Sequence, residues 1–185
     1  MLGAVPTIEA VRDILRDAKL PNIVLDPVLI CKGQEPGAAL DIDMALRSEV
    51  LPFADVLTPN LVEASILSGM ESLETVRDYG EAAKRIAEDG PKAVLVKGGM
   101  DTPGDQAIDV LWDGAELTEF ARPKIGSTRV SGAGDTLATA IAAGLAKGQG
   151  LHDAVDAAKT FVTEGVARAI EGKTPFDVVW QGDRA

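Results

Sequence analysis

Apolar residues alternate along this chain between short unbroken runs and longer stretches with helical spacing. Buried strands are predicted by the short runs at residues 22–25 with 28–30, at 54–57 and at 93–96. Helices are predicted by the spaced stretches at residues 6–15, 41–50, 61–68, 75–88, 137–145 and 155–169. Residues 107–112 alternate instead, and Asp113-Gly114 is a turn signal that leads to a returning strand at 115–120.

This order of elements predicts a single domain of the α/β class over residues 1–185. Unbroken apolar strands are typical of a parallel sheet that is covered by helices on both faces. We therefore expect a central, mostly parallel sheet flanked by helices, with a β-hairpin near one edge. In that hairpin, Ile108, Val110 and Trp112 would share one face.

Two local predictions concern the first third of the chain. Pro6 can occupy the first turn of a helix whose buried stripe is Ile8, Val11, Ile14 and Leu15. Residues 31–37, CKGQEPG, are predicted to be a loop, with Asp41 capping the helix that follows.

Composition limits the possible partners. The chain has 185 residues, of which 46% are hydrophobic, so it is long enough for a substantial core. A formal net charge of −11 argues against nucleic acid or an anionic membrane as the main partner, and a polyanionic ligand would need a local electropositive pocket. No apolar run approaches the roughly 18 residues of a membrane span, and the one cysteine cannot form an internal disulfide. We expect a cytoplasmic protein.

Three polar loops follow the predicted strands, where ligands of open α/β sheets bind. They contain Asp26 through Lys32-Gly33, Thr58-Pro59-Asn60 with Glu63, and Lys97-Gly98-Gly99. Asp26, Asn60 and Glu63 offer the hard oxygen ligands that Mg²⁺ and its waters prefer. Each also has an ordinary structural explanation: a turn before proline, a helix cap and a first-turn acid.

The stretch RVSGAGDTLATAIAAGLAKG leads from a glycine loop directly into a helix of small residues. Gly132, Ala133 and Gly134 leave backbone N–H groups unobstructed at the positive end of that helix, which favours an anion. An acid beside such a site, here Asp135, could accept the proton of an attacking hydroxyl during phosphoryl transfer. A tight turn with Asp135 stabilising the helix dipole explains the same residues. His152, the only histidine, has no evident partner, and we expect it on the surface.

Four segments together resemble the ribokinase superfamily, and within it the vitamin kinases that phosphorylate pyridoxal or hydroxymethylpyrimidine. They are VLDPVLICKGQE, LPFADVLTPNLVEASILSGM, AVLVKGG and VSGAGDTLATAIAAGLAKG, in that order. The resemblance covers the chain from Met1 to about Ile170. It implies a ribokinase-like fold, usually as a homodimer, that uses ATP and Mg²⁺ to phosphorylate a hydroxymethyl group.

The resemblance also implies roles for individual residues. Asp135 would be the general base, and the amides of Gly132, Ala133 and Gly134 would form the anion hole. Asp26, Asn60 and Glu63 would organise Mg²⁺ and the ATP phosphates, with Asp26 and Glu63 as the metal ligands. The nucleotide would also contact Lys97, Gly98 and Thr136, and a flap over the substrate would contain Cys31, Lys32 and Gly33.

Two departures bear on the substrate. Many close relatives have cysteine where Asp135 stands, whereas most of the superfamily has aspartate. Cys31 resembles a cysteine of a bacterial pyridoxal kinase group that approaches the substrate aldehyde, and this favours a pyridoxal vitamer; a small buried hydrophobe explains it equally well. Hydroxymethylpyrimidine or its monophosphate, a sugar, and a non-catalytic nucleotide-binding remnant are the alternatives.

The start of the chain is the largest departure. Met1-Leu2-Gly3 resembles an internal segment of the family, so we expect an N-terminally truncated chain that lacks the first strands. Such a chain would expose an unpaired sheet edge, and we expect it to be a poor catalyst.

Overall fold

The structure, a computed structural model, describes residues 2, 4–28, 36–127, 129–172 and 176–182. Its five-stranded sheet has the order β1 (Val24–Leu25), β2 (Val56–Leu57), β3 (Ala93–Lys97), β4 (Gln106–Trp112) and β5 (Leu117–Pro123). The first three strands are parallel, and β3–β4 and β4–β5 pair antiparallel. The α/β class and the hairpin at one edge are confirmed, and the described sheet is mixed.

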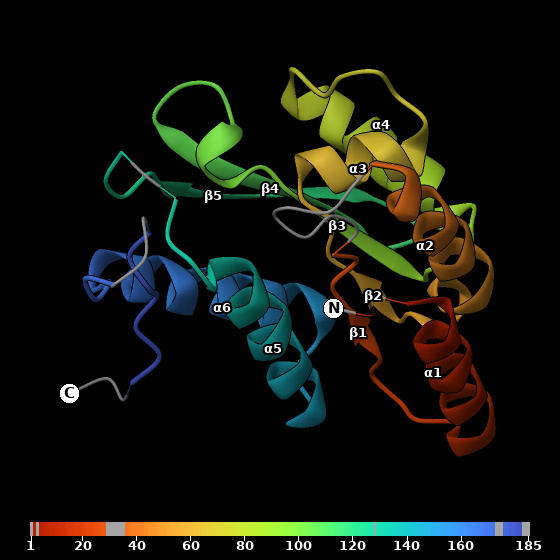
Figure 1. Cartoon of the computed structure of the whole chain (residues 1–185). Helices are drawn as coiled ribbons and strands as arrows, with labels where there is room; N and C mark the ends of the chain where they lie inside the picture. The colour runs from red at the N-terminus through yellow and green to blue at the C-terminus, as the bar shows by residue number, and fades with distance from the viewer. Residues whose placement is uncertain (1, 3, 29–35, 128, 173–175, 183–185) are drawn as a thin grey trace.

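Helices cover both faces of the sheet (Figure 1). One face is covered by α3 (Leu61–Ser68) and α4 (Val76–Ala87), and the other by α5 (Ala133–Ala146) and α6 (Leu151–Ala167). Two further helices, α1 (Val5–Ala18) and α2 (Pro36–Glu49), pack against each other beside β1 and β2, and two short 3₁₀ turns are η1 (Leu51–Phe53) and η2 (Gly99–Asp101). Among the described helices, none combines the length and apolar character needed to cross a bilayer.

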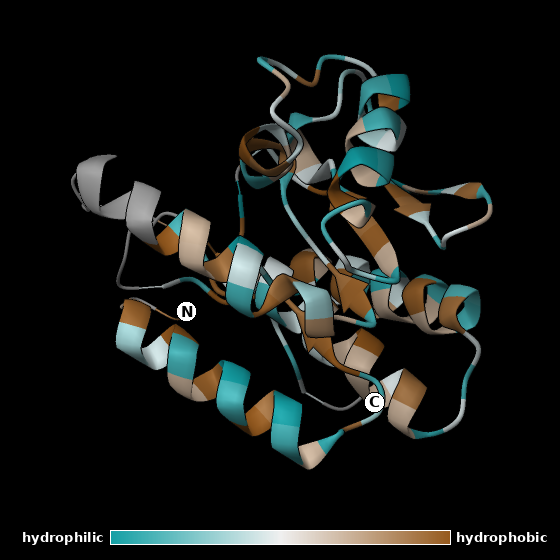
Figure 2. Cartoon of the chain, turned by 90° about the vertical axis from the view of Figure 1, so that its right-hand side faces the viewer, coloured by the Kyte–Doolittle hydropathy of each residue, from teal (hydrophilic) through white to brown (hydrophobic). Residues whose placement is uncertain are grey.

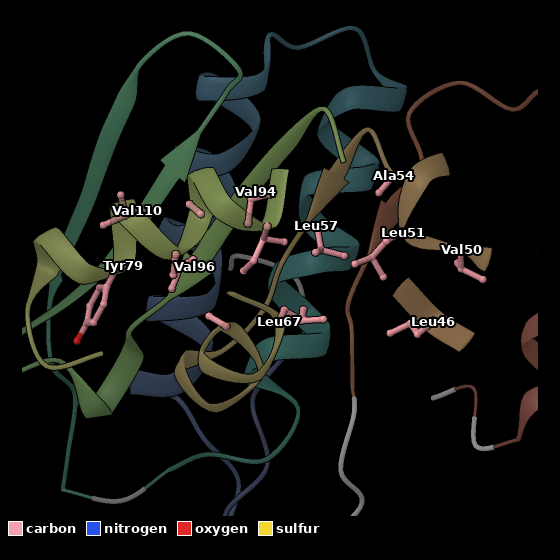
Figure 3. Packing of buried hydrophobic residues seen from close by; sticks show 14 of the residues in the cluster. Leu46, Val50, Leu51, Ala54, Leu57, Leu67, Tyr79, Val94, Val96 and Val110 are labelled. Atoms are coloured by element: carbon pink, nitrogen blue, oxygen red, sulfur yellow. The ribbon is translucent and has the colours of Figure 1, made fainter. Parts of the chain in front are cut away.

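Strand β3 separates two hydrophobic cores because its side chains alternate between the faces. Val94 and Val96 point into the core that α1–α4 cover, whereas Ala93 and Leu95 point into the core under α5 and α6. All four side chains are buried. Figure 3 shows the first core, in which Leu57, Val94, Val96 and Val110 of the sheet meet Leu67 and Tyr79 of the helices. The expected shared face of Ile108, Val110 and Trp112 is confirmed, since all three pack in this core.

The first predicted strand is shorter in the structure than in the prediction. Only Val24–Leu25 forms β1, and Val28 instead donates its N–H to the Asp26 carbonyl oxygen at 2.9 Å. Pro27 has no N–H for a ladder, which explains why pairing ends before it. Residues 29 and 30 lie outside the described residues.

Helix α2 begins five residues earlier than predicted, at Pro36 rather than Asp41. Proline is favoured in the first turn of a helix, where its missing N–H costs no hydrogen bond. The rest of the predicted loop, residues 31–35, lies outside the described residues.

The returning strand of the hairpin begins later than predicted, at Leu117 instead of Ala115. The Asp113 carboxylate accepts the N–H groups of Ala115 and Glu116, both at 2.8 Å, so these two residues belong to the turn. Gly114 has φ = +95°, a conformation that favours glycine.

The predicted apolar stripe of α1 is right for three residues and wrong for Ile14. Ile8 is fully buried, and Val11 and Leu15 pack against the same core, whereas Ile14 is 61% exposed. At about 100° per residue, Ile14 lies about 120° from Ile8 around the helix, at the margin of the buried face. Hydrophilic and hydrophobic residues alternate along the α1 ribbon in Figure 2, as expected for a helix with one buried face.

These two isoleucines provide a matched test of the core. Ile8→Ala is expected to lower the free energy of unfolding by about 2–5 kcal/mol, because it leaves a cavity in packed surroundings. Ile14→Ala is expected to change it by less than about 0.5 kcal/mol. Urea unfolding monitored by circular dichroism measures both, and equal effects would contradict the assignment of the buried face.

Candidate active site

A pocket of about 460 Å³ lies where the carboxyl ends of the parallel strands meet the first turn of α5 and one side of α6. Its polar lining comes from segments far apart in the sequence. Those residues are Asp26, Asn60, Glu63, Lys97, Asp101, Asp109, Arg129, Asp135, Lys159 and Thr163. The rest of the wall is largely apolar and includes Ile125, Leu137, Val162 and Val166.

An ion pair joins the ends of β1 and β3 beneath the start of α5. Lys97 Nζ lies 2.6 Å from Asp26 Oδ1, which also accepts the Thr58 hydroxyl at 3.0 Å. A Cβ atom at position 134 would lie 3.4 Å from Lys97 Nζ and 3.9 Å from Asp26 Oδ2. The helix start therefore lies within van der Waals distance of the ion pair.

The first turn of α5 presents backbone donors to this pocket. Gly132 precedes the helix with φ = +83°, and none of the described side chains caps the turn. The N–H groups of Ala133 and Gly134 consequently remain available at the positive end of the helix, close to the Lys97 ammonium. Asp135 lies in the same turn and is exposed. The helix start and the lysine ammonium thus offer a polyanion hydrogen-bond donors at one point of an acidic chain.

The glycine loop is held from behind by the C-terminal segment, which the sequence analysis did not anticipate. Ser131 N–H donates to the Asp177 carbonyl oxygen at 2.7 Å, and Val179 N–H donates to the Ser131 carbonyl oxygen at 3.0 Å. The Thr136 hydroxyl donates to the Gly132 carbonyl oxygen at 2.7 Å and accepts from Gln181 at 2.6 Å. Thr136 is buried behind the loop and does not line the pocket.

Asn60 and Glu63 cap α3 reciprocally. Asn60 Oδ1 accepts the Glu63 N–H at 3.0 Å, and Glu63 Oε2 accepts the Asn60 N–H at 2.8 Å. Both residues also line the pocket. Burial raises the pKa of Glu63 to about 7, and the nearby Asp26 carboxylate adds to the shift, while the Asn60 N–H and Lys97 oppose it.

A second ion pair, between Asp109 and Lys159, lines the pocket and was missed by the sequence analysis. Lys159 Nζ lies 2.6 Å from Asp109 Oδ2, and both side chains are 6% exposed. Asp109 Oδ1 accepts the N–H groups of Gly98 at 3.0 Å and Gly99 at 3.5 Å. The available signals were an acid within the apolar strand 108–112 and a lysine within the apolar face of a helix. Burial of charge without a partner is costly, so each implied a partner.

The structure brings most of the predicted site residues together. Asp26, Asn60, Glu63, Lys97, Gly98, Ala133, Gly134 and Asp135 all line the pocket. Gly132 and Thr136 lie directly behind it, at the junction with the C-terminal segment. The expected flap residues Cys31, Lys32 and Gly33 lie outside the described residues.

The described side chains offer two places with carboxylates suited to a metal ion. In the pocket, Asp26 Oδ1 and Glu63 Oε2 are engaged by the protein, and within the part of the chain that the structure describes their other oxygens remain for a cation. This hard oxygen set fits Mg²⁺, which keeps several waters. Away from the pocket, ligand atoms of Asp113, Glu116 and His152 lie within 4.8 Å of one another at the hairpin turn. The His152 side chain is 41% exposed, in line with the expected surface position. Its Nε2 lies 3.6 Å from Asp113 Oδ2, a neighbour that the sequence did not reveal.

An α/β sheet with an anion-accepting helix start and paired charges at its strand ends defines a class of phosphate-handling domains. The family model for phosphomethylpyrimidine kinase matches residues 1–178, and the chain belongs to that family. The resemblance to the vitamin kinases of the ribokinase superfamily is thereby confirmed.

Individual relatives carry both kinase names. The chain is 40% identical over 166 residues to a pyridoxine kinase of Bacillus subtilis, covering 90% of this chain and 61% of that protein. It is 35% identical over 174 residues to a hydroxymethylpyrimidine/phosphomethylpyrimidine kinase of Haemophilus influenzae, covering 92% and 64%. The chain thus spans less than two thirds of these relatives.

Solved structures agree with this assignment. An ADP complex of Bacillus subtilis pyridoxal kinase superimposes with a TM-score of 0.91 at 37% identity, covering 97% of this chain and 67% of that one. Staphylococcus aureus pyridoxal kinase with AMP-PCP and pyridoxal gives a TM-score of 0.86 at 32% identity, covering 97% and 64%.

The raised pKa of Glu63 predicts a pH-dependent stability. Between its ordinary value of 4.5 and about 7, the folded protein binds more protons at Glu63 than the unfolded chain, so the free energy of unfolding falls as pH rises through this window. The loss amounts to about 3 kcal/mol, from about 1.4 kcal/mol per pKa unit. In Glu63→Gln this contribution is expected to disappear.

Urea unfolding at pH 5 and pH 8 measures this difference. The exposed Glu81→Gln is the matched control and is expected to keep the pH dependence of the unsubstituted chain. If Glu63→Gln kept it too, the assignment of the raised pKa to Glu63 would be wrong.

Proposed function

We propose that this chain is the nucleotide-binding and catalytic part of an ATP-dependent kinase that phosphorylates the hydroxymethyl group of a pyridoxal, pyridoxine or pyridoxamine vitamer. The observation that carries the proposal is the convergence of Asp135, the uncapped first turn of α5 and the Asp26–Lys97 pair on one pocket. A base, an anion hole and a cation are the parts that phosphoryl transfer needs.

In the proposed reaction, the Asp135 carboxylate accepts the proton of the substrate hydroxyl as its oxygen attacks the γ-phosphorus of ATP. The bond between that phosphorus and the bridging oxygen of the β-phosphate breaks, and ADP leaves. The N–H groups of Gly132, Ala133 and Gly134 stabilise the charge on the transferring phosphoryl group. Lys97 and Gly98 lie along the nucleotide, and the apolar wall of Leu137, Val162 and Val166 accepts the base.

In the proposed site, Mg²⁺ would be held by Asp26 and Glu63, with Asn60 orienting Glu63 through the cap of α3. When bound, the ion neutralises phosphate charge. A cation beside the buried Glu63 carboxylate also favours its ionised form, which offsets the cost of burial.

Two acceptor chemistries have support among the relatives. Relatives named pyridoxine kinase and the neighbour solved with pyridoxal support a pyridoxal vitamer. The family description and the Haemophilus influenzae relative support hydroxymethylpyrimidine or its monophosphate as the second candidate. Both acceptors are small heteroaromatic rings with a hydroxymethyl group.

The proposal extends to the domain, the oligomeric state and the location of the protein. We expect residues 1–185 to form part of one ribokinase-like domain that acts as a homodimer in the cytoplasm. In the proposed enzyme, a flap that contains Cys31, Lys32 and Gly33 would cover the acceptor.

The role of Asp135 is tested with Asp135→Asn. A general base contributes about 10²–10⁴-fold to the rate, so kcat is expected to fall by that factor while the affinity for ATP changes little. A coupled assay of ADP release gives kcat, and isothermal titration gives the affinity. The surface substitution Asp156→Asn is the control; an unchanged rate in Asp135→Asn would remove Asp135 from the mechanism.

The acceptor is identified by offering pyridoxal, pyridoxine and hydroxymethylpyrimidine in parallel with ATP and Mg²⁺. Preferred turnover of the pyridoxal vitamers is expected. Protein that binds ATP but releases no ADP with any acceptor would contradict catalysis by this chain and favour a nucleotide-binding unit without activity.

A further inference from the structure

The buried pair of Asp109 and Lys159 connects three parts of the pocket wall. Asp109 lies on β4, Lys159 on α6, and the Asp109 carboxylate holds the N–H groups of Gly98 and Gly99 in the loop after β3. Both charged residues also line the pocket itself. The pair is therefore both a structural link and part of the surface that a ligand meets.

The Gly98–Gly99 loop packs closely on β4. A Cβ atom at position 98 would lie 2.2 Å from both the Ile108 carbonyl oxygen and the Thr102 hydroxyl, so the loop packs directly on β4. Gly98 N–H also donates to the Ile108 carbonyl oxygen at 3.1 Å. The Gly98 N–H is thus shared between the Ile108 carbonyl oxygen and the Asp109 carboxylate, so it is already engaged before any ligand binds.

Lys159 offsets the repulsion that the Asp109 carboxylate would exert on an anionic ligand. A lone carboxylate in the wall of a pocket for a polyanion would repel the ligand, and low-dielectric surroundings would strengthen the repulsion. Lys159 lies 2.6 Å away, and the pair is nearly neutral when seen from the pocket. The described titratable groups that also face the pocket are Asp26, Glu63, Lys97, Asp101, Arg129 and Asp135, and Lys97 and Arg129 are paired with Asp26 and Asp101.

We infer that Asp109 and Lys159 are positioning residues that hold the Gly98–Gly99 loop while keeping the pocket wall neutral toward the nucleotide phosphates. This inference rests on the proposed nucleotide binding and deepens it. By offsetting the charge of Asp109, Lys159 favours the binding of adenine ligands that carry phosphates over those that carry none. A purely structural pair would affect both kinds of ligand equally.

Substituting Lys159 and substituting Asp109 should therefore have opposite effects on one ratio. This ratio is the affinity for ADP divided by the affinity for adenosine. Lys159→Met leaves the Asp109 carboxylate uncompensated, and the ratio is expected to fall by at least about fivefold. Asp109→Asn keeps an oxygen acceptor for the Gly98 N–H but leaves the Lys159 ammonium uncompensated, and the ratio is expected to rise by a similar factor. The double variant Asp109→Asn/Lys159→Met has neither charge and is expected to return close to the original ratio.

Affinities are measured at pH 7 without Mg²⁺ by equilibrium dialysis of labelled ADP and adenosine, on protein shown to be folded by circular dichroism. Lys92→Met breaks a 2.6 Å ion pair with Asp55 at an exposed position outside the pocket lining, so it controls for the loss of a lysine and is expected to leave the ratio unchanged. If Lys159→Met does not fold, Lys159→Gln, which keeps a donor for Asp109, takes its place.

Three results would overturn the inference. Equal loss of ADP and adenosine affinity in both single variants would show a structural role only. A ratio in the double variant that differs from the original by about fivefold or more would show that neutrality of the pair is not what matters. If the unsubstituted chain bound neither ligand, the proposed nucleotide binding would fail first, and this inference with it.

Discussion

The close approach of the first turn of α5 to the Asp26–Lys97 ion pair is the constraint on which the pocket depends. Three strand ends, two charged side chains and one helix start meet there, and a Cβ atom at position 134 would already be in van der Waals contact with the lysine ammonium. The positive end of the helix and Lys97 then act on the same space, so an anion between them is attracted from two sides. A bulkier residue would separate the helix from the sheet edge and weaken both contributions.

Three of the five acids that line this pocket are paired with a basic residue, in a chain that as a whole carries −11. Asp26 is matched by Lys97, Asp109 by Lys159 and Asp101 by Arg129. Among the described residues no lysine forms an ion pair with Glu63, and burial raises its pKa to about 7. The pocket is consequently a place where one further positive charge would be stabilised by the protein.

The sequence predicted the elements more reliably than it predicted their ends. Helix α3 begins and ends where the pattern placed it, because Asn60, Glu63 and Gly69 are local signals that act within a few residues. Strand β1 ends because of Pro27, and α2 begins at Pro36. The spacing of apolar residues does not reveal whether a proline ends an element or begins one. Ile14 shows the same limit, since an apolar residue at the margin of a helix face can be buried or exposed according to what packs there.

The site residues with local motifs were found from the sequence, whereas those whose roles depend on distant partners were not. Asp26, Asn60, Lys97 and Asp135 follow strands or open helices, and strand ends gather at one edge of a sheet. The Asp109–Lys159 pair could not be assigned in the same way, because the two residues are 50 positions apart and only the packing of α6 on the hairpin brings them together.

The support of the glycine loop by the C-terminal segment limits how far the loop can be regarded as a self-contained motif. Ser131 pairs with Val178, and Trp180 N–H donates to the Gly165 carbonyl oxygen at 3.1 Å. A Cβ atom at position 165 would lie 2.5 Å from the Trp180 carbonyl oxygen, so α6 must also provide a glycine. Transplanting residues 131–135 to a strand–helix junction in another scaffold would therefore transfer the chemical groups without their geometry, unless α6 and the segment around Val178 were transplanted with them.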